Sequence, residues 1–179
     1  MSRVPIILID TRVYTKLAEE KGILERVLEA LLNNLEKGQY IHVPLSQIRE
    51  LESKLKIPKN YIEKTFSKIR RLSLTQCRGF RLVHKSELQI SGHGKHEKIL
   101  VEIQHQFRKH DKVDRHLALL AFKYSMKNKY VKIITTDHEL HNRICEKISM
   151  YRMEGKIIPL HIERESVNFY RVEQALRDP

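Results

Sequence analysis

Four carboxylates lie at sequence positions where an α/β protein commonly has its reactive groups. Asp10 directly follows the apolar run that opens the chain, and Asp137 follows a second strand-like run near the other end. Glu50 and Asp114 each lie close to the expected start of a helix. Parallel strands bring their carboxyl ends to one edge of a sheet, where such proteins keep the active crevice. We therefore expect these four side chains to converge.

Converging acids point to metal chemistry. Two carboxylates about 4 Å apart repel by roughly 4 kcal/mol at an effective dielectric constant near 20, so a cluster needs a cation or raised pKa values. Oxygen ligands alone favour Mg²⁺ or Mn²⁺ over zinc. Such an ion could activate water against a phosphodiester, with one of the acids accepting its proton. The simpler interpretation is that Asp10, Asp114 and Asp137 cap helices and that Glu50 is an ordinary surface residue.

The hydrophobic pattern predicts alternating strands and helices from end to end. That order favours a three-layer α/β/α sandwich with a mainly parallel central sheet. Side chains at helical spacing give each helix one apolar face; after Pro58 this face runs from Tyr61 to Leu72. The expected strands are 4–9, 40–43, 131–135 and 156–162, and the expected helices are 11–21, 23–35, 45–55, 59–72, 97–108, 111–124, 138–150 and 165–176.

We expect residues 1–179 to form a single domain, because this length suits one core. Residues 73–96 are the least readable segment. Residues 80–84 could form an extra strand, and 91–94 resemble a flexible turn. The segment is too short to bury an interior of its own, so we interpret it as an elaboration on the core.

Composition and charge narrow the class of protein. The chain is 41% hydrophobic and 31% charged, as in folded proteins, and its 34 Lys and Arg exceed its 22 acids to give a net charge of +12. A cation of this size attracts polyanions, and nucleic acid is the natural partner. The longest apolar stretch is about half of the roughly 20 residues that cross a bilayer, and no secretory signal is recognisable. With two widely spaced cysteines, Cys77 and Cys145, we expect a cytoplasmic protein.

One expected helix carries a basic side opposite its apolar face. A solvated surface is the ordinary interpretation of such a charge run, and phosphate contact is the functional one. His110 and His116, beside the third acid, could also contact a substrate. The residues that we assign to nucleic-acid contact are Arg12, Lys64, Lys68, Arg71 and Arg115.

The four acids lie in motifs that resemble those of the PIN-domain nucleases. In that family a hydrophobic strand ends in Asp-Thr or Asp-Ser, and Glu follows a Val-Pro junction by six residues. A helix then opens with Asp-x-x-Ile/Leu-x-x-x-Ala, and a later strand ends in Thr-x-Asp. This chain has, in the same order, Ile9-Asp10-Thr11, Val43-Pro44 with Glu50, Asp114 with Leu117 and Ala121, and Thr135-Thr136-Asp137.

The resemblance implies a Mg²⁺- or Mn²⁺-dependent endoribonuclease. Asp10, Glu50, Asp114 and Asp137 would be catalytic and hold the metal, and RNA as the substrate is implied by the resemblance alone. Thr11 and Thr135 would support the acids through their hydroxyl groups, and Asp111 would be either an auxiliary acid or a helix cap. The family, which includes toxin-type members, also allows for a homodimer and an inhibitory antitoxin-like protein.

Two other functions stay open. The chain could be a non-catalytic RNA-binding or assembly protein that keeps this fold, because the family often has Asn or Ser where this chain has Arg12. It could also be a structure-specific DNA nuclease. Zinc is disfavoured, because the pairs His93/His96 and His138/His141 lack cysteines or a matching second pair. No glycine-rich phosphate loop is present, which argues against a nucleotide cofactor.

Overall fold

The computed structural model describes residues 4–90, 95–109, 111–154 and 160–164, together with residues 172, 174 and 176. The expected turn at 91–94 and His110 lie outside the described residues, as do residues 155–159 and most of the expected closing helix at 165–176.

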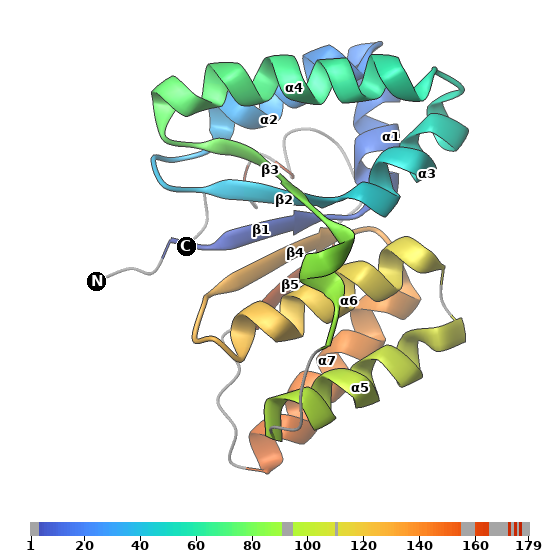
Figure 1. Ribbon diagram of the computed structural model, residues 1–179, viewed down its shortest axis with the longest axis vertical. Helices are drawn as coiled ribbons and strands as arrows, with labels where there is room; N and C mark the ends of the chain where they lie inside the picture. Colours follow the sequence, from blue (N-terminus) through green and yellow to red (C-terminus); the bar gives the residue numbers. More distant parts are fainter. Residues whose placement is uncertain are drawn as a thin grey trace.

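A parallel sheet forms the middle layer of the molecule (Figure 1). Its strands are β1 (Ile6–Ile9), β2 (Tyr40–Pro44), β3 (Gly79–Val83), β4 (Val131–Thr135) and β5 (Leu160–Arg164). In the described part of the chain they pair, all parallel, in the order β3-β2-β1-β4-β5. The expected α/β class and three-layer architecture with a parallel sheet are therefore confirmed.

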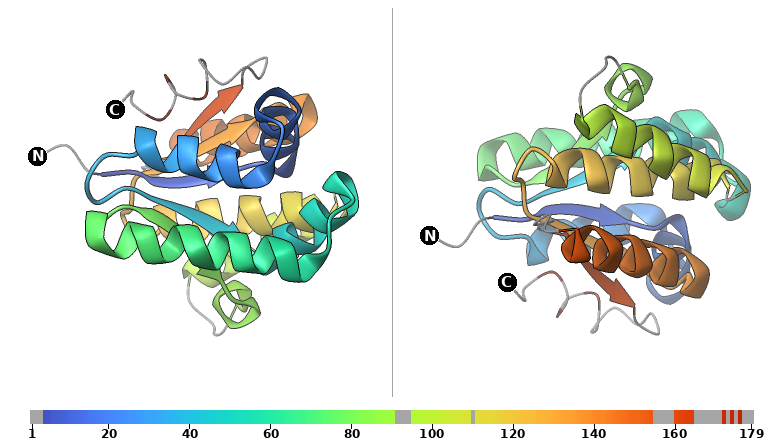
Figure 2. Two further views of the ribbon diagram at one scale, coloured as in Figure 1. Left: turned by 90° about the horizontal axis from the view of Figure 1, so that it is seen from above. Right: turned by 90° about the horizontal axis from the view of Figure 1, so that it is seen from below.

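Helices cover both faces of the sheet (Figures 1 and 2). On one face lie α1 (Thr11–Lys21), α2 (Leu24–Asn34) and α4 (Lys59–Gln76), with α3 (Leu45–Leu55) at the edge. On the other lie α5 (Lys95–Gln106), α6 (Lys112–Ser125) and α7 (His138–Met153), with the short 3₁₀ helices η1 (Lys85–Leu88) and η2 (Phe107–Lys109). No described helix is both long and apolar enough to span a membrane.

Strand β1 is the centre of the fold, between β2 and β4. Successive side chains of a strand point to opposite faces. Ile7 and Ile9 accordingly pack into the core that contains α1, α2 and α4, whereas Leu8 packs into the core that contains α6 and α7. All three are completely buried. This explains why the strand is a continuous apolar run.

The segment that was least readable in the sequence contains the edge strand β3. Residues 73–76 continue α4, and β3 pairs with β2 from Tyr40↔Gly79 onward. Gly79 has φ 144°, and a Cβ there would lie 2.1 Å from the Cβ of Ser73. Only glycine therefore lets β3 approach α4 so closely. This part of residues 73–96 belongs to the central sheet.

The apolar face expected on α4 is only partly correct. Ile62, Phe66 and Ile69 are buried, but Tyr61 is 41% exposed and Leu72 is 46% exposed. At 3.6 residues per turn, positions 61 and 72 fall at the margin of the arc centred on the buried residues, whereas Ser73 falls near its middle and is buried.

Candidate functional site

The acids that end β1 and β4 meet at the carboxyl edge of the sheet. The two strands are direct neighbours, with Ile9 beside Ile134. Asp10 is the N-cap of α1 and Asp137 is the N-cap of α7. These helices leave toward opposite faces of the sheet (Figure 1), which opens a crevice between the two strand ends.

Asp10 is held rigidly in this crevice. Its side chain is almost completely buried, and Thr135 donates a hydrogen bond of 2.9 Å from Oγ1 to Oδ2 of Asp10. The Asp10 backbone N–H donates to the carbonyl of Ile134, which extends the β1–β4 ladder. Burial raises the pKa of Asp10, while the Thr135 bond and the nearby Arg12 oppose the rise. Thr135 therefore supports the buried carboxylate, as a second-layer hydroxyl group should.

Glu50 reaches the same edge from α3. Thr11 donates a hydrogen bond of 2.7 Å from Oγ1 to Oε2 of Glu50, which joins the first turn of α1 to α3. Partial burial raises the pKa of Glu50, the Thr11 bond opposes this, and the charges of Asp111 and Asp10 raise it further. Glu50 is thus a half-buried group beside other acids rather than an isolated surface residue.

Asp114 is the carboxylate on which the others converge. It lies in the first turn of α6 and is 7% exposed. Its pKa is raised to about 8, first by burial and then by repulsion from Asp111, Asp10, Asp137 and Glu50. All five carboxylates therefore share one electrostatic neighbourhood, although four of them come from the starts of α1, α6 and α7 and the fifth comes from the middle of α3.

Asp111, not Asp114, caps α6. Its Oδ1 accepts hydrogen bonds of 2.9 Å from the backbone N–H groups of Val113 and Asp114. The side chain is exposed, yet its charge is close enough to raise the pKa of both Asp114 and Glu50. Both interpretations of Asp111 therefore have a physical basis: it is a cap, and it adds negative charge to the crevice.

Asp137 is the acid most fully engaged by the chain itself. Its Oδ1 accepts from the backbone N–H groups of Glu139 and Leu140 at 2.8 and 2.9 Å. Its Oδ2 lies 3.2 Å from Nη1 of Arg12, which projects from the first turn of α1. Arg12 thus lies beside the crevice as expected for a residue close to Asp10, but its guanidinium group is engaged by Asp137.

The donor set fits a hard cation, although it is not assembled around one. Within the described residues, no three His, Cys, Asp or Glu side chains come together as a metal cluster. Arg12 and the capping bonds hold Asp137, and Thr11 holds Glu50. Burial, and next the charges of neighbouring acids, nevertheless raise the pKa values of Glu50 and Asp114, and burial raises that of Asp10. Carboxylate oxygens are the ligands that Mg²⁺ and Mn²⁺ prefer.

Gln47 is a structural part of the site that the sequence analysis missed. It is completely buried, and its Nε2 donates to the carbonyl of Ile9 at 2.6 Å and to Oγ1 of Thr11 at 3.3 Å. It therefore fixes the turn on which Asp10 stands. Its Oε1 is buried without a hydrogen-bond partner in the described structure. Gln47 lies three positions before Glu50, hence on the same face of α3, and this spacing was the available signal.

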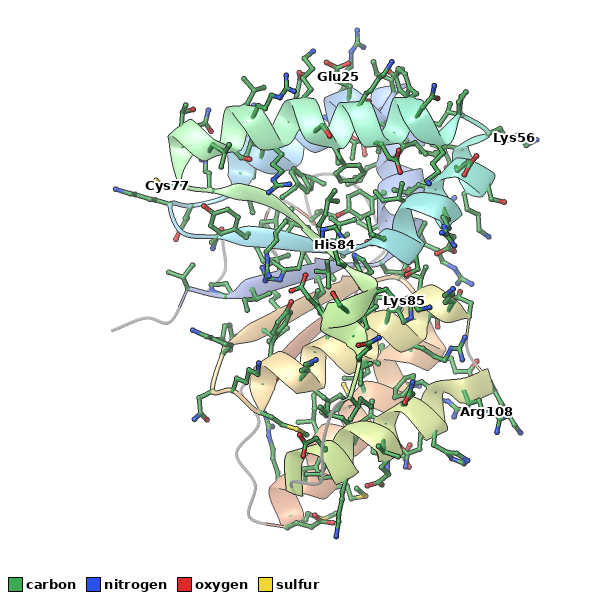
Figure 3. All side chains as sticks on the ribbon, viewed as in Figure 1. Glu25, Lys56, Cys77, His84, Lys85 and Arg108 are labelled. Atoms are coloured by element: carbon green, nitrogen blue, oxygen red, sulfur yellow. The ribbon has the colours of Figure 1, made fainter. Side chains whose placement is uncertain are left out.

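The cations assigned to nucleic-acid contact divide into two groups. Arg12 and Arg115 lie at the acidic edge, next to Asp10 and Asp114 in the chain. Lys64, Lys68 and Arg71 line a shallow pocket on the outer side of α4, where Lys68 pairs with Glu25. Figure 3 shows Lys56 at one end of this helix and Cys77 at the other. Lys64, Lys68 and Arg71 follow one another along α4, and Lys64 lies nearest to the end that adjoins α3.

Comparisons with protein-family models, curated proteins and solved structures found no match for this chain.

Proposed function

We propose that this chain is a Mg²⁺- or Mn²⁺-dependent endoribonuclease of the PIN type. The observation that carries the proposal is Asp114, a buried carboxylate whose pKa is raised to about 8, first by burial and then by the charges of Asp111, Asp10, Asp137 and Glu50. Placing five carboxylates close together, with Asp10 and Asp114 buried, is costly without a function for their charge. The order of the sequence motifs supports the PIN type, and RNA as the substrate rests on that resemblance.

Asp10, Glu50, Asp114 and Asp137 are the residues that would hold the metal. A bound Mg²⁺ or Mn²⁺ would act as a Lewis acid that makes water a stronger nucleophile and stabilises the departing oxygen of the phosphodiester. The chain itself contributes orientation: Thr135 fixes Asp10, and Thr11 fixes Glu50. With a pKa near 8, Asp114 holds a proton at neutral pH until a cation replaces it.

Basic residues around this acidic crevice would attract the substrate. The net charge of +12 supplies a long-range attraction for a polyanion, and the side chain of Arg12 is 61% exposed beside the acids. A cytoplasmic location accompanies the proposal, because Cys77 and Cys145 are both free thiols.

One observation favours a second candidate function. Arg12 neutralises Asp137 directly, and an internal cation in a metal crevice is what a chain that binds RNA without cleaving it would have. A non-catalytic RNA-binding protein on the same fold is therefore the alternative.

The deciding experiment incubates labelled single-stranded RNA with the protein in Mn²⁺ and, separately, in EDTA. The proposal expects cleavage in Mn²⁺, none in EDTA, and none by Asp10→Asn or Glu50→Gln. Glu52→Gln is the matched control, because it removes the same charge from α3 two residues away and should cleave normally. Cleavage that persists in EDTA or in Asp10→Asn overturns the metal mechanism. RNA binding without cleavage in Mg²⁺ and in Mn²⁺ favours the alternative.

A further inference from the structure

Two adjoining pockets form one groove beside the acidic crevice. The larger has a volume of about 560 Å³ and lies between η1, α5 and α6. The smaller has a volume of about 140 Å³ and lies where α3 and the end of β3 meet α6. Lys85, Leu88, Lys112 and His116 line both, so the pockets are continuous. We call this surface the basic groove; its charged residues are Arg49, Lys85, Lys112 and Arg115.

In the described part of the chain, the cations of the basic groove lack the carboxylate partners that several other surface cations have. Lys16, Lys59, Arg81 and Arg143 each pair with a nearby glutamate. In the described part of the chain, none of the four groove cations forms such a pair, and Nε of Arg115 is buried without a hydrogen-bond partner. Four unpaired cations around one groove favour an anionic ligand.

Several apolar side chains line the rest of the groove. Leu88, Ile90 and Leu119 line the larger pocket, together with Val101, which is 53% exposed. His116 shares a hydrogen bond of 2.7 Å between its Nδ1 and Oγ of Ser46. An apolar pocket surface with cations at its rim suits a nucleobase that is attached to its phosphate.

The basic groove and the acidic crevice are built on the same two helix starts. Arg49 adjoins Glu50 on α3, and Lys112 and Arg115 adjoin Asp111 and Asp114 at α6. Neighbouring helix positions point about 100° apart, so each helix turns its acid to the crevice and its cation to the groove. Figure 3 shows Lys85 on η1, beside α6. A strand in the groove therefore has its backbone next to the acids.

We propose that the basic groove binds an unpaired stretch of the nucleic-acid strand. Lys85, Lys112 and Arg115 contact its phosphates, and one unstacked base enters the apolar pocket beside Val101. A duplex is excluded from this mode because its bases are stacked and paired. The inference rests on the proposed function for the identity of the strand as substrate.

The test measures binding in EDTA, where neither metal binding nor cleavage contributes. Fluorescence anisotropy with a labelled single-stranded RNA compares wild type with Lys85→Ala/Lys112→Ala. The matched control is Lys127→Ala/Lys129→Ala, which removes two exposed lysines between α6 and β4, at the opposite end of α6. We expect about a tenfold loss for the groove variant, a loss under about twofold for the control, and a salt slope reduced by about 1.4 for the groove variant alone. Equal losses in both variants overturn the proposal.

A second comparison tests the base pocket. Val101→Glu places a carboxylate at its rim, and Met153→Glu is the control on α7, because Met153 is 83% exposed and does not line the groove. Only Val101→Glu should weaken binding. Duplex RNA and polyphosphate, which offer phosphates without accessible bases, should compete more weakly than the single strand. Equal competition by either polyanion overturns the base pocket.

Failure of this inference is distinguishable from failure of the proposed function. If RNA is never cleaved but only the groove variant loses affinity, the groove is correct and the nuclease is not. If RNA is cleaved in Mn²⁺ and the groove variant binds and cleaves like wild type, the nuclease is correct and the groove is not.

Discussion

Arg12 and Asp137 form an ion pair across the mouth of the crevice, with Nη1 of Arg12 3.2 Å from Oδ2 of Asp137. The pair joins the first turn of α1 to the start of α7, the two helices that leave β1 and β4. It gives one acid of the crevice an internal counterion, while Asp114 has four acids around it. The crevice is therefore electrostatically asymmetric: a cation should be drawn to the Asp10–Asp114 side first.

Removing the arginine should tighten metal binding and weaken RNA binding. In Arg12→Ala, a cation no longer competes with Arg12 for Asp137, so the Kd for Mn²⁺ should fall several-fold. RNA affinity in EDTA should fall as well, because Arg12 is an exposed cation beside the acidic crevice, whereas Lys16 is already paired with Glu19. Titrations of Mn²⁺ and of labelled RNA measure both effects. Lys16→Ala, on the same helix, should change neither; an unchanged Mn²⁺ affinity in Arg12→Ala would show that the pair does not compete with the metal.

Asp114 should make the metal-free protein less stable as the pH rises. Its pKa is raised from 3.8 to about 8 in the folded state, so the folded protein binds more protons than the unfolded chain between these values. Asp114→Asn removes this effect, and its stability relative to wild type should increase with pH across that window, by up to about 1.4 kcal/mol per pH unit. Urea unfolding in EDTA at about pH 5, 7 and 9 measures it. Glu52→Gln should show no comparable trend.

His42 should make the protein less stable as the pH falls, which is opposite to the effect of Asp114. The ring is buried against Tyr124, with a hydrogen bond of 3.0 Å to its hydroxyl group. Burial, and next the charge of Arg81, lower the pKa of His42 from 6.5 to about 4, while Glu87 opposes the shift. Its contribution to stability is therefore complete above pH 6.5 and is lost as the pH falls toward 4.

The substitution His42→Phe should become more stable relative to wild type on acidification through this range, measured by urea unfolding. Tyr124→Phe is the control, because it removes the hydroxyl partner but keeps His42 buried. It should retain the acid sensitivity of wild type. A stability difference between His42→Phe and wild type that does not change with pH would contradict the assignment.

Replacing Gln47 should lower both the stability of the protein and its RNA cleavage. Gln47→Leu leaves the carbonyl of Ile9 without this donor, which should cost about 1–3 kcal/mol of unfolding free energy. It also loosens the turn that carries Asp10, so RNA cleavage should fall by more than the loss of folded protein explains. Ser125→Ala is the control, because its buried hydroxyl bonds only within α6, to Ala121. Normal cleavage by folded Gln47→Leu would show that Asp10 is positioned without it.

The central strands were predictable because they are buried on both faces. β4 has the predicted bounds, since Val131–Thr135 is buried throughout. β3 was harder to read, because its partners and the glycine contact with Ser73 lie far away in the sequence. Helix bounds were accurate where a proline or glycine marks an end, as at α3, whereas the margins of the apolar face of α4 depended on how α4 packs.

The meeting of Asp10 and Asp137 was predictable from strand ends alone, because parallel strands share one edge. Thr11 and Thr135 stand out in the sequence beside Asp10 and Asp137, but the acids that they support lie elsewhere in the chain: Thr135 bonds to Asp10 and Thr11 bonds to Glu50. The Arg12–Asp137 pair and the role of Gln47 were not predictable. Both depend on contacts between elements that are tens of residues apart in the chain. Sequence spacing does not indicate which side chains make such contacts.

The bond from Thr135 to Asp10 spans 125 positions of the chain. A nascent polypeptide that has not yet emerged from the ribosome as far as β4 has Asp10 but neither the hydroxyl group that orients it nor Asp137. For the proposed nuclease, this order of synthesis would delay the assembly of the acidic site. Each new copy would lack the complete crevice while the part of the chain before β4 is being made.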